Sequence, residues 1–194
     1  MKRREFIASA AALALLPMQA FALTTAQAEV LVNKVVVDIN RVIASGKSLS
    51  GMIADFEAIF KRYGDVNIIA RSALGADARR LSASQERAYV SAFTGYISRK
   101  YGKRFNEFVG GRIEVTGGRQ VKSFFEVQAT AILPGQSPFG VNFLVSDKSG
   151  KDLFFDMVIE GISLRLTEKS EIGAMLDKNR GNIDGLIADL KKAG

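Results

Sequence analysis

The fold is decided by one stretch of the sequence, Val121-Lys122-Ser123-Phe124-Phe125-Glu126-Val127-Gln128-Ala129-Thr130-Ala131. Small or apolar residues occupy every second position from Val121 onward, which is typical of a β-strand with one buried face. Apolar runs at 141–145 and 153–159 predict two more strands, preceded by turn sequences at 134–135 and 147–150.

One more strand is predicted on the N-terminal side of this stretch. It starts at Ile113 and ends at a turn expected at Gly117-Gly118. Four strands joined by short turns predict an antiparallel meander. At Phe124-Phe125 and again at Phe154-Phe155, neighbouring aromatic residues point to opposite faces of the sheet. Both faces are therefore apolar over part of their length, and either helices cover both faces or one face lines a cavity.

Helical spacing flanks the predicted sheet on both sides. The capping-box pattern Ser82-Ala83-Ser84-Gln85 opens the longest predicted helix, whose aromatic stripe continues to Phe108. The run Val35-Val36-Val37 leaves a strand open as the alternative in the first helix, because β-branched residues favour strands. The predicted helices lie at 28–43, 52–63, 65–75, 82–108, 163–179 and 183–190. This order of helices, strands and helices predicts an α+β fold.

The N-terminus has the layout of a secretory signal peptide. A basic cluster at 2–4 precedes an apolar run at 7–16, and an A-x-A site follows at Ala20-Phe21-Ala22. The start also resembles a twin-arginine signal, so the export route stays open. We expect a signal peptide at 1–22 and a single lipid-binding domain at 23–194, with cleavage after Ala28 or a buried N-terminal helix as alternatives. No later apolar run reaches spanning length, so we expect a soluble exported protein.

The composition excludes several kinds of catalytic site. Among 194 residues there is no His and no Cys, which rules out Ser-His-Asp and Cys-His nucleophilic sites, structural zinc sites and disulfides. Two pairs of carboxylates are close in sequence, Asp55 with Glu57 and Asp152 with Asp156. We interpret them as solvent-facing residues, in preference to metal ligands or catalytic acids. The net charge is +7, of which the predicted signal peptide contributes three Lys or Arg and one Glu. A moderately basic exported protein is expected to meet an anionic lipid or an acidic partner more readily than nucleic acid. We expect a binding protein with no catalytic residues and no metal.

Three motifs carry a resemblance to a known family. They are Ile69-Ala70-Arg71-Ser72-Ala73-Leu74-Gly75, Ser84-Gln85-Glu86-Arg87 and Phe155-Asp156-Met157-Val158-Ile159-Glu160-Gly161-Ile162-Ser163-Leu164. In this order, behind a signal peptide, they resemble the MlaC / toluene-tolerance family of periplasmic phospholipid-binding proteins. The D-x-x-x-E-G-x-S pattern from Asp156 to Ser163 is the most specific part, and the resemblance covers essentially the whole mature chain.

The chain departs from the family pattern at three places. Ala76-Asp77-Ala78 stands where an aromatic residue is common, Thr167-Glu168-Lys169 replaces a Tyr-Arg pair, and Leu153-Phe154 replaces a segment with Trp. These departures indicate a divergent branch of the family. They leave the ligand open between a phospholipid and a hopanoid.

The resemblance implies a curved antiparallel sheet of about four strands wrapped by the N- and C-terminal helices. An apolar cavity between sheet and helices would hold acyl chains, with phospholipid as ligand and no cofactor. It also implies a periplasmic carrier between an outer-membrane lipoprotein complex and an inner-membrane MCE-type ABC transporter, through transient contacts with both. A periplasmic interaction module without a ligand cavity is the alternative, and an exported hydrolase that uses carboxylates is a third.

We expect the cavity lining to combine one face of the long helix with one face of the sheet. The expected lining residues are Tyr89, Phe93, Tyr96, Ile97 and Tyr101 from the helix, Phe125, Val127, Phe143, Val145, Phe155 and Met157 from the sheet, and Leu74 and Ile162 from the family-like motifs. Arg71 and Arg87 are the candidates for contact with a headgroup phosphate. Ordinary core packing is the alternative role for each lining residue.

Overall fold

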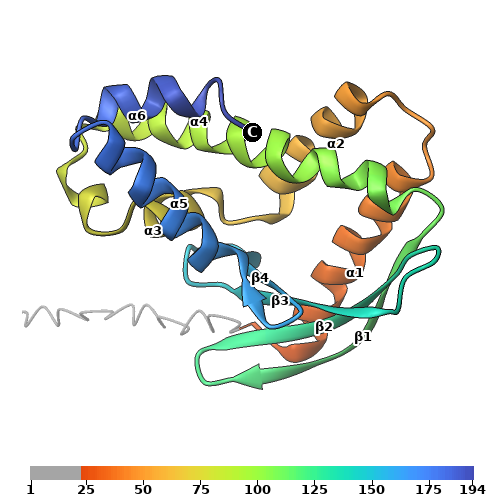
Figure 1. Ribbon diagram of the computed structural model, residues 1–194. Coiled ribbons are helices and arrows are strands. Elements are labelled where there is room, and N and C mark those ends of the chain that lie inside the picture. Colours follow the sequence, from red (N-terminus) through yellow and green to blue (C-terminus); the bar gives the residue numbers. More distant parts are fainter. Residues whose placement is uncertain (1–22) are drawn as a thin grey trace, which may run out of the picture.

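The computed structural model describes residues 23–194, and only the backbone of Phe105 and Asn106. The predicted signal peptide at 1–22 therefore lies outside the described residues. An antiparallel sheet with helices before and after it confirms the predicted α+β class (Figure 1). The elements are α1 (Thr25–Ile43), α2 (Leu49–Tyr63), α3 (Val66–Leu74), η1 (Gly75–Arg80), α4 (Ala83–Gly102), η2 (Lys103–Phe108), β1 (Arg112–Val121), β2 (Phe124–Ile132), β3 (Phe139–Ser146), β4 (Leu153–Ile159), β5 (Ile162–Ser163), α5 (Leu164–Lys178) and α6 (Ile183–Leu190).

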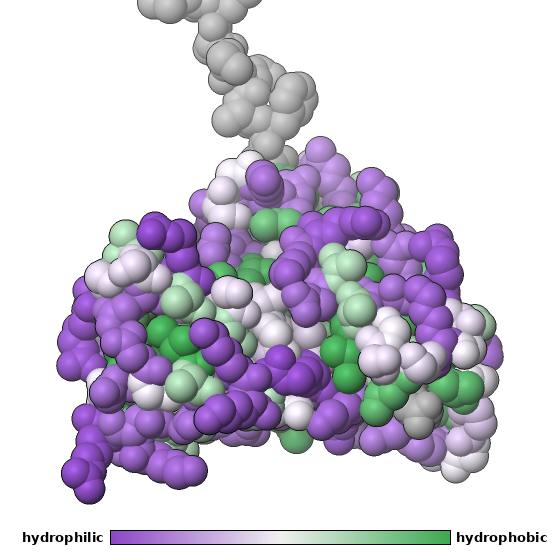
Figure 2. All heavy atoms as spheres, turned by 90° about the horizontal axis from the view of Figure 1, so that it is seen from above, coloured by the Kyte–Doolittle hydropathy of each residue, from purple (hydrophilic) through white to green (hydrophobic). Residues whose placement is uncertain are grey.

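The curved sheet lies on one side of the molecule, and α4 with α6 lies on the opposite side (Figure 1). α1 packs against β1 and β2, whereas α4 packs against α2, α3 and α6. Seen from the side of α4 and α6, the surface is mainly hydrophilic, and hydrophobic side chains form small, separate patches (Figure 2). Of the helices between residues 23 and 194, none has the length and apolar character that crossing a bilayer requires.

The sheet is a five-stranded antiparallel meander in the order β1-β2-β3-β4-β5. The predicted meander is confirmed, with β5 as an additional strand of two residues. The turn expected at Gly117-Gly118 is wrong, because these glycines lie within β1 beside a register shift, and Lys122-Ser123 make the turn instead. A Cβ at position 118 would lie 2.9 Å from Cγ of Glu29, so this glycine lets α1 cross the strand closely.

Helix boundaries follow capping side chains. Ser82 forms the expected capping box at the start of α4, and the side chains of Asp65 and Asn182 cap α3 and α6. The strand alternative at 35–37 is wrong, because these residues belong to α1, which buries one apolar face. The helical period of that face outweighs the strand preference of three consecutive valines.

The longest helix is shorter than predicted. α4 ends at Gly102 and continues as the 3-10 helix η2, instead of remaining α-helical to Phe108. A Cβ at position 102 would lie 3.0 Å from Cα of Ile53, so the glycine permits close contact between α4 and α2.

One face of the sheet is buried and the other is largely polar. Val127, Phe143 and Val145 have no exposed surface, whereas Glu126 on the opposite face binds Arg119 at 2.6 Å. The helices therefore cover one face only. Phe124 lies on the side of β2 opposite the core and packs edge to face on Phe155, with ring centroids 5.6 Å apart. At this aromatic pair, the prediction that both faces of the sheet carry apolar residues is confirmed.

Candidate functional site

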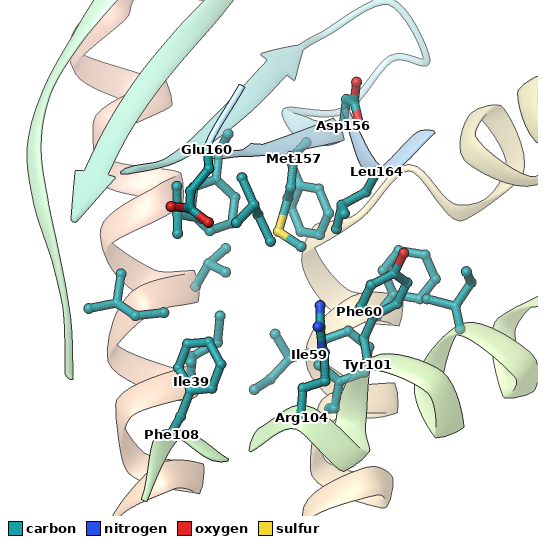
Figure 3. Close-up of a pocket in the computed structure, with 18 of the residues that line it drawn as sticks. Ile39, Ile59, Phe60, Tyr101, Arg104, Phe108, Asp156, Met157, Glu160 and Leu164 are labelled. Atoms are coloured by element: carbon teal, nitrogen blue, oxygen red, sulfur yellow. The ribbon is translucent and has the colours of Figure 1, made fainter. Parts of the chain in front are cut away.

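A cavity of about 390 Å³ lies between the sheet and the helices. Figure 3 shows side chains from both sides of the molecule pointing into it. Most of its wall is aliphatic or aromatic. The helices contribute Val35 and Ile39 from α1, Phe56, Ile59 and Phe60 from α2, Ile69 from α3, Ile97 and Tyr101 from α4, Phe108 from η2 and Leu164 from α5. The sheet contributes Ile113 from β1, Leu133 directly after β2, Phe139, Val141 and Phe143 from β3, and Phe154, Phe155, Met157 and Ile159 from β4.

A series of aromatic rings joins α2 to the sheet along this wall. The rings of Phe56 and Phe60 are stacked with centroids 6.1 Å apart, because residues four apart share one face of a helix. Phe60 lies 6.3 Å from Phe154, which in turn meets Phe143 edge to face at 5.8 Å. Offset and edge-to-face pairs of this kind stabilise beyond simple burial. The wall is therefore held in shape by contacts among its own lining residues.

The motif from Asp156 to Ser163 ties β4 to the start of α5. Asp156 is buried, and its carboxylate accepts hydrogen bonds from the Ser163 hydroxyl at 2.6 Å and the Arg165 backbone amide at 2.9 Å. Glu160 and Gly161 make the intervening turn with positive φ angles of 50° and 83°. The spacing of the motif thus places the first turn of α5 against the cavity. Asp156, Leu164 and Arg165 all line it.

A polar cluster formed by Tyr96, Lys100, Tyr101, Glu168 and Glu171 borders the cavity where α4 meets α5. The Glu168 side chain is 2% exposed and accepts hydrogen bonds from Lys100 at 2.8 Å and from the Tyr101 hydroxyl at 2.5 Å. Lys100 also binds Glu171 at 2.6 Å. Burial, the largest cause, and the hydrogen bond to Glu168, the second, raise the pKa of Tyr101 far above its usual value. The phenol therefore stays protonated and remains a hydrogen-bond donor.

Charged and polar side chains from several elements form the exposed rim. Arg104 and Glu107 come from η2, Gln136 and Ser137 from the loop after β2, and Glu160 from the turn after β4. Figure 3 shows the guanidinium of Arg104 and the carboxylate of Glu160 pointing toward the same space. The site therefore has an apolar interior and a polar edge that carries both signs of charge.

Part of the predicted lining is brought together at this cavity. Ile97, Tyr101, Phe143, Phe155 and Met157 all line it. Eight other candidates lie outside its wall: Leu74, Tyr89, Phe93, Tyr96, Phe125, Val127 and Val145, which are buried, and Ile162, which is 63% exposed.

The two arginines predicted to hold a headgroup also lie outside the cavity wall. Arg71 forms an ion pair with Glu86, and Arg87 is exposed on α4. The arginines that line the cavity are Arg104 and Arg165. Arg165 follows directly on the family-like motif, which is the sequence signal that could have pointed to it.

The larger omission in the predicted lining concerns the N-terminal helices. Ile39 from α1 and Ile59 and Phe60 from α2 line the cavity, whereas the predicted lining contains no residue of these two helices. The amphipathic faces at 28–43 and 52–63 were the available signal. Among residues 23–194, no group of three acidic, His or Cys side chains is arranged to hold a metal ion.

The fold and the cavity define a class of small α+β proteins with an apolar cavity between a curved antiparallel sheet and flanking helices. The chain belongs to the MlaC protein family, whose model matches residues 29–192. Its fold is similar to the crystal structure of a phospholipid-binding protein from Ralstonia solanacearum, solved in complex with a phospholipid. The TM-score is 0.73 at 19% sequence identity, over 85% of this chain and 95% of the other.

Proposed function

We propose that this protein is a periplasmic lipid carrier, which takes the acyl chains of a phospholipid into the cavity between sheet and helices. One observation carries the proposal: an internal space of about 390 Å³ whose wall is formed mainly by apolar side chains from both layers of the fold. This volume falls within the range of about 300–1,000 Å³ that is usual for ligand sites. Membership of the MlaC family and the phospholipid bound to the similar Ralstonia protein support the choice of ligand.

The physical chemistry of lipids explains why such a carrier is needed. Each methylene exposed to water costs about 0.8 kcal/mol, so two chains of roughly fifteen methylenes cost about 24 kcal/mol. An apolar cavity replaces the bilayer interior with a similar environment and makes transfer nearly neutral. Docking to partners then sets the direction of transfer.

The family resemblance extends the proposal to location and partners. A signal peptide at 1–22 would export the protein to the periplasm. There it would serve as the mobile component between an outer-membrane lipoprotein complex and an inner-membrane MCE-type ABC transporter. The cavity argues against an interaction module with a solid interior. A hopanoid in place of a phospholipid is the second candidate ligand.

Lipid extraction from the purified exported protein tests the carrier function directly. We expect native mass spectrometry to show one lipid bound per protein, and the extracted mass to identify a phospholipid or a hopanoid. Recovery of no lipid, together with a melting temperature that does not change on delipidation, would contradict the proposal.

A matched pair of variants connects binding to the cavity. Met157 lines the cavity, whereas its neighbour Val158 is not part of the wall. Met157→Trp fills the space and is expected to abolish lipid retention, while Val158→Trp retains lipid. Equal retention by both variants would place the lipid elsewhere.

A further inference from the structure

Two buried side-chain nitrogen or oxygen atoms of the described residues have no hydrogen-bond partner, and both belong to residues that line the cavity. They are Oε2 of Glu168 and Nε of Arg165. Nε of Arg165 forms an ion pair with Oδ2 of Asp156 at 3.7 Å, a distance too long for a hydrogen bond. A buried polar atom without a partner destabilises the protein, because it has lost its hydrogen bonds to water.

The other oxygen of Glu168 already has its partners. Oε1 accepts from both Lys100 and Tyr101, and neither of these donors bonds Oε2. Glu168 lines the cavity and therefore holds one buried acceptor that the protein itself leaves unused. Its natural complement is a hydrogen-bond donor, and a positively charged donor gives the stronger bond.

Arg165 supplies the opposite chemistry one turn away. Residues three apart on a helix are neighbours on the same face, so Arg165 and Glu168 stand side by side on α5. The Arg165 side chain is 32% exposed and its NH1 donates to Ser72, which leaves Nε unbonded. A cationic donor therefore lies beside an anionic acceptor, and partial exposure allows the arginine to adjust to a ligand.

We infer that Arg165 and Glu168 recognise a zwitterionic headgroup that carries a phosphate and a primary ammonium. Arg165 binds the phosphate oxygens, and Oε2 of Glu168 accepts a hydrogen bond from the ammonium. The inference rests on the proposed lipid-carrier function and specifies which headgroup the carrier selects. A quaternary ammonium has no N–H and cannot form the second contact.

Competition between lipids with identical acyl chains tests this inference. The purified full chain is incubated with vesicles of equal parts phosphatidylethanolamine, phosphatidylcholine and phosphatidylglycerol, then re-isolated, and the retained lipids are quantified by mass spectrometry. We expect about tenfold enrichment of phosphatidylethanolamine over phosphatidylcholine, as a hydrogen bond to a charged group provides. Equal retention of these two lipids, or enrichment of phosphatidylglycerol over both, overturns the inference and leaves the carrier function intact. Retention of none of them contradicts the carrier function itself.

Variants assign the preference to the two side chains. Glu168→Gln keeps the size of the side chain but turns an amide donor toward the cavity, so the preference for phosphatidylethanolamine should disappear. Glu171→Gln is the matched control, because Glu171 shares Lys100 but does not line the cavity, and it should keep the preference. Arg165→Gln should lower retention of all three lipids severalfold. Unchanged selectivity in Glu168→Gln, or unchanged retention in Arg165→Gln, contradicts the corresponding contact.

Stepwise methylation of the headgroup provides a test on the unmodified protein. Phosphatidylethanolamine has three N–H donors, and each added methyl group removes one until phosphatidylcholine has none. We expect retention to fall mainly at the last methylation, when the final donor is lost. Equal retention across the whole series contradicts the inference even where a variant fails to fold.

Discussion

The two halves of α4 carry one continuous aromatic face but meet different surroundings. In the first half, Tyr89 and Phe93 are fully buried with ring centroids 5.9 Å apart, and the Tyr89 hydroxyl donates to the carbonyl of Ala70 at 3.0 Å. In the second half, Ile97 and Tyr101 line the cavity. The same helical spacing therefore serves solid packing at one end and an open space at the other. Each half of α4 becomes packed core or cavity wall according to whether side chains or the cavity lie opposite it.

Removing a ring from the packed half should have the largest effect on stability. Phe93→Ala leaves an empty space among residues that cannot collapse into it, and is expected to lower the free energy of unfolding by about 3–5 kcal/mol. Urea denaturation measures the change. Arg87→Ala, at an exposed position of the same half, is the control and should change stability by less than about 0.5 kcal/mol.

A truncation in the cavity half should be less damaging. Ile97 already borders an open space, so Ile97→Ala enlarges that space and should cost about 2 kcal/mol, at the low end for such changes. Lipid retention, measured by extraction, should persist because the wall remains apolar. A loss of stability equal to that of Phe93→Ala would remove the distinction between the two halves.

Deleting one hydroxyl from each half gives a finer comparison. Tyr101→Phe removes a donor to the Glu168 carboxylate and should cost about 1.5 kcal/mol or slightly more, because hydrogen bonds to charged groups are the stronger ones. Tyr89→Phe removes a bond to a neutral carbonyl and should cost about 1 kcal/mol. Thermal unfolding compares the two variants, and the reverse order would show that the polar cluster contributes little to stability.

The smallest expected effect is a dependence of stability on pH through Glu171. Burial, the largest single influence, raises the pKa of this carboxyl, but hydrogen bonds from Lys100 and Tyr96 and the charge of Lys100 together lower it below the usual 4.5. Since the folded-state pKa is the lower one, the stabilisation is complete above pH 4.5 and is lost as the pH falls through the folded value.

Glu171→Gln removes this titration. The difference in stability between wild type and variant should therefore shrink as the solution is acidified below about pH 4.5, the ordinary pKa range of a glutamate. Denaturation curves at several pH values measure it. A difference that stays constant down to pH 2 would indicate that Glu171 titrates normally.

Much of the fold could be predicted because its signals are local. The capping box at Ser82 depends on nearby groups alone, and it opens α4 where the sequence predicts it. Gly117-Gly118 has the composition of a hairpin turn but lies within β1, because α1 crosses closely there. That crossing is a tertiary contact, which the local sequence does not contain.

The cavity was harder to predict than the fold for a similar reason. Helical spacing identifies the buried face of α4 but does not distinguish a packed neighbour from an open space, so Phe93 and Ile97 have the same pattern. Arg165 and Glu168 have charged side chains on a helix, and such residues usually face water. Only the position of α5 beside Tyr101 shows that they border the cavity.

The edges of the sheet have a consequence for the behaviour of the protein when its cavity is empty. β5 is only two residues long, and exposed charges at Arg112, Glu114 and Arg119 lie along β1 at the other edge. Short strands and charged side chains hinder an edge from pairing with a strand of another molecule. Without a ligand, the apolar wall of the cavity has nothing to cover it, and protected edges keep such molecules from aggregating through their strands. We therefore expect the empty form to remain monodisperse at concentrations where an uncharged β1 edge would lead to fibres.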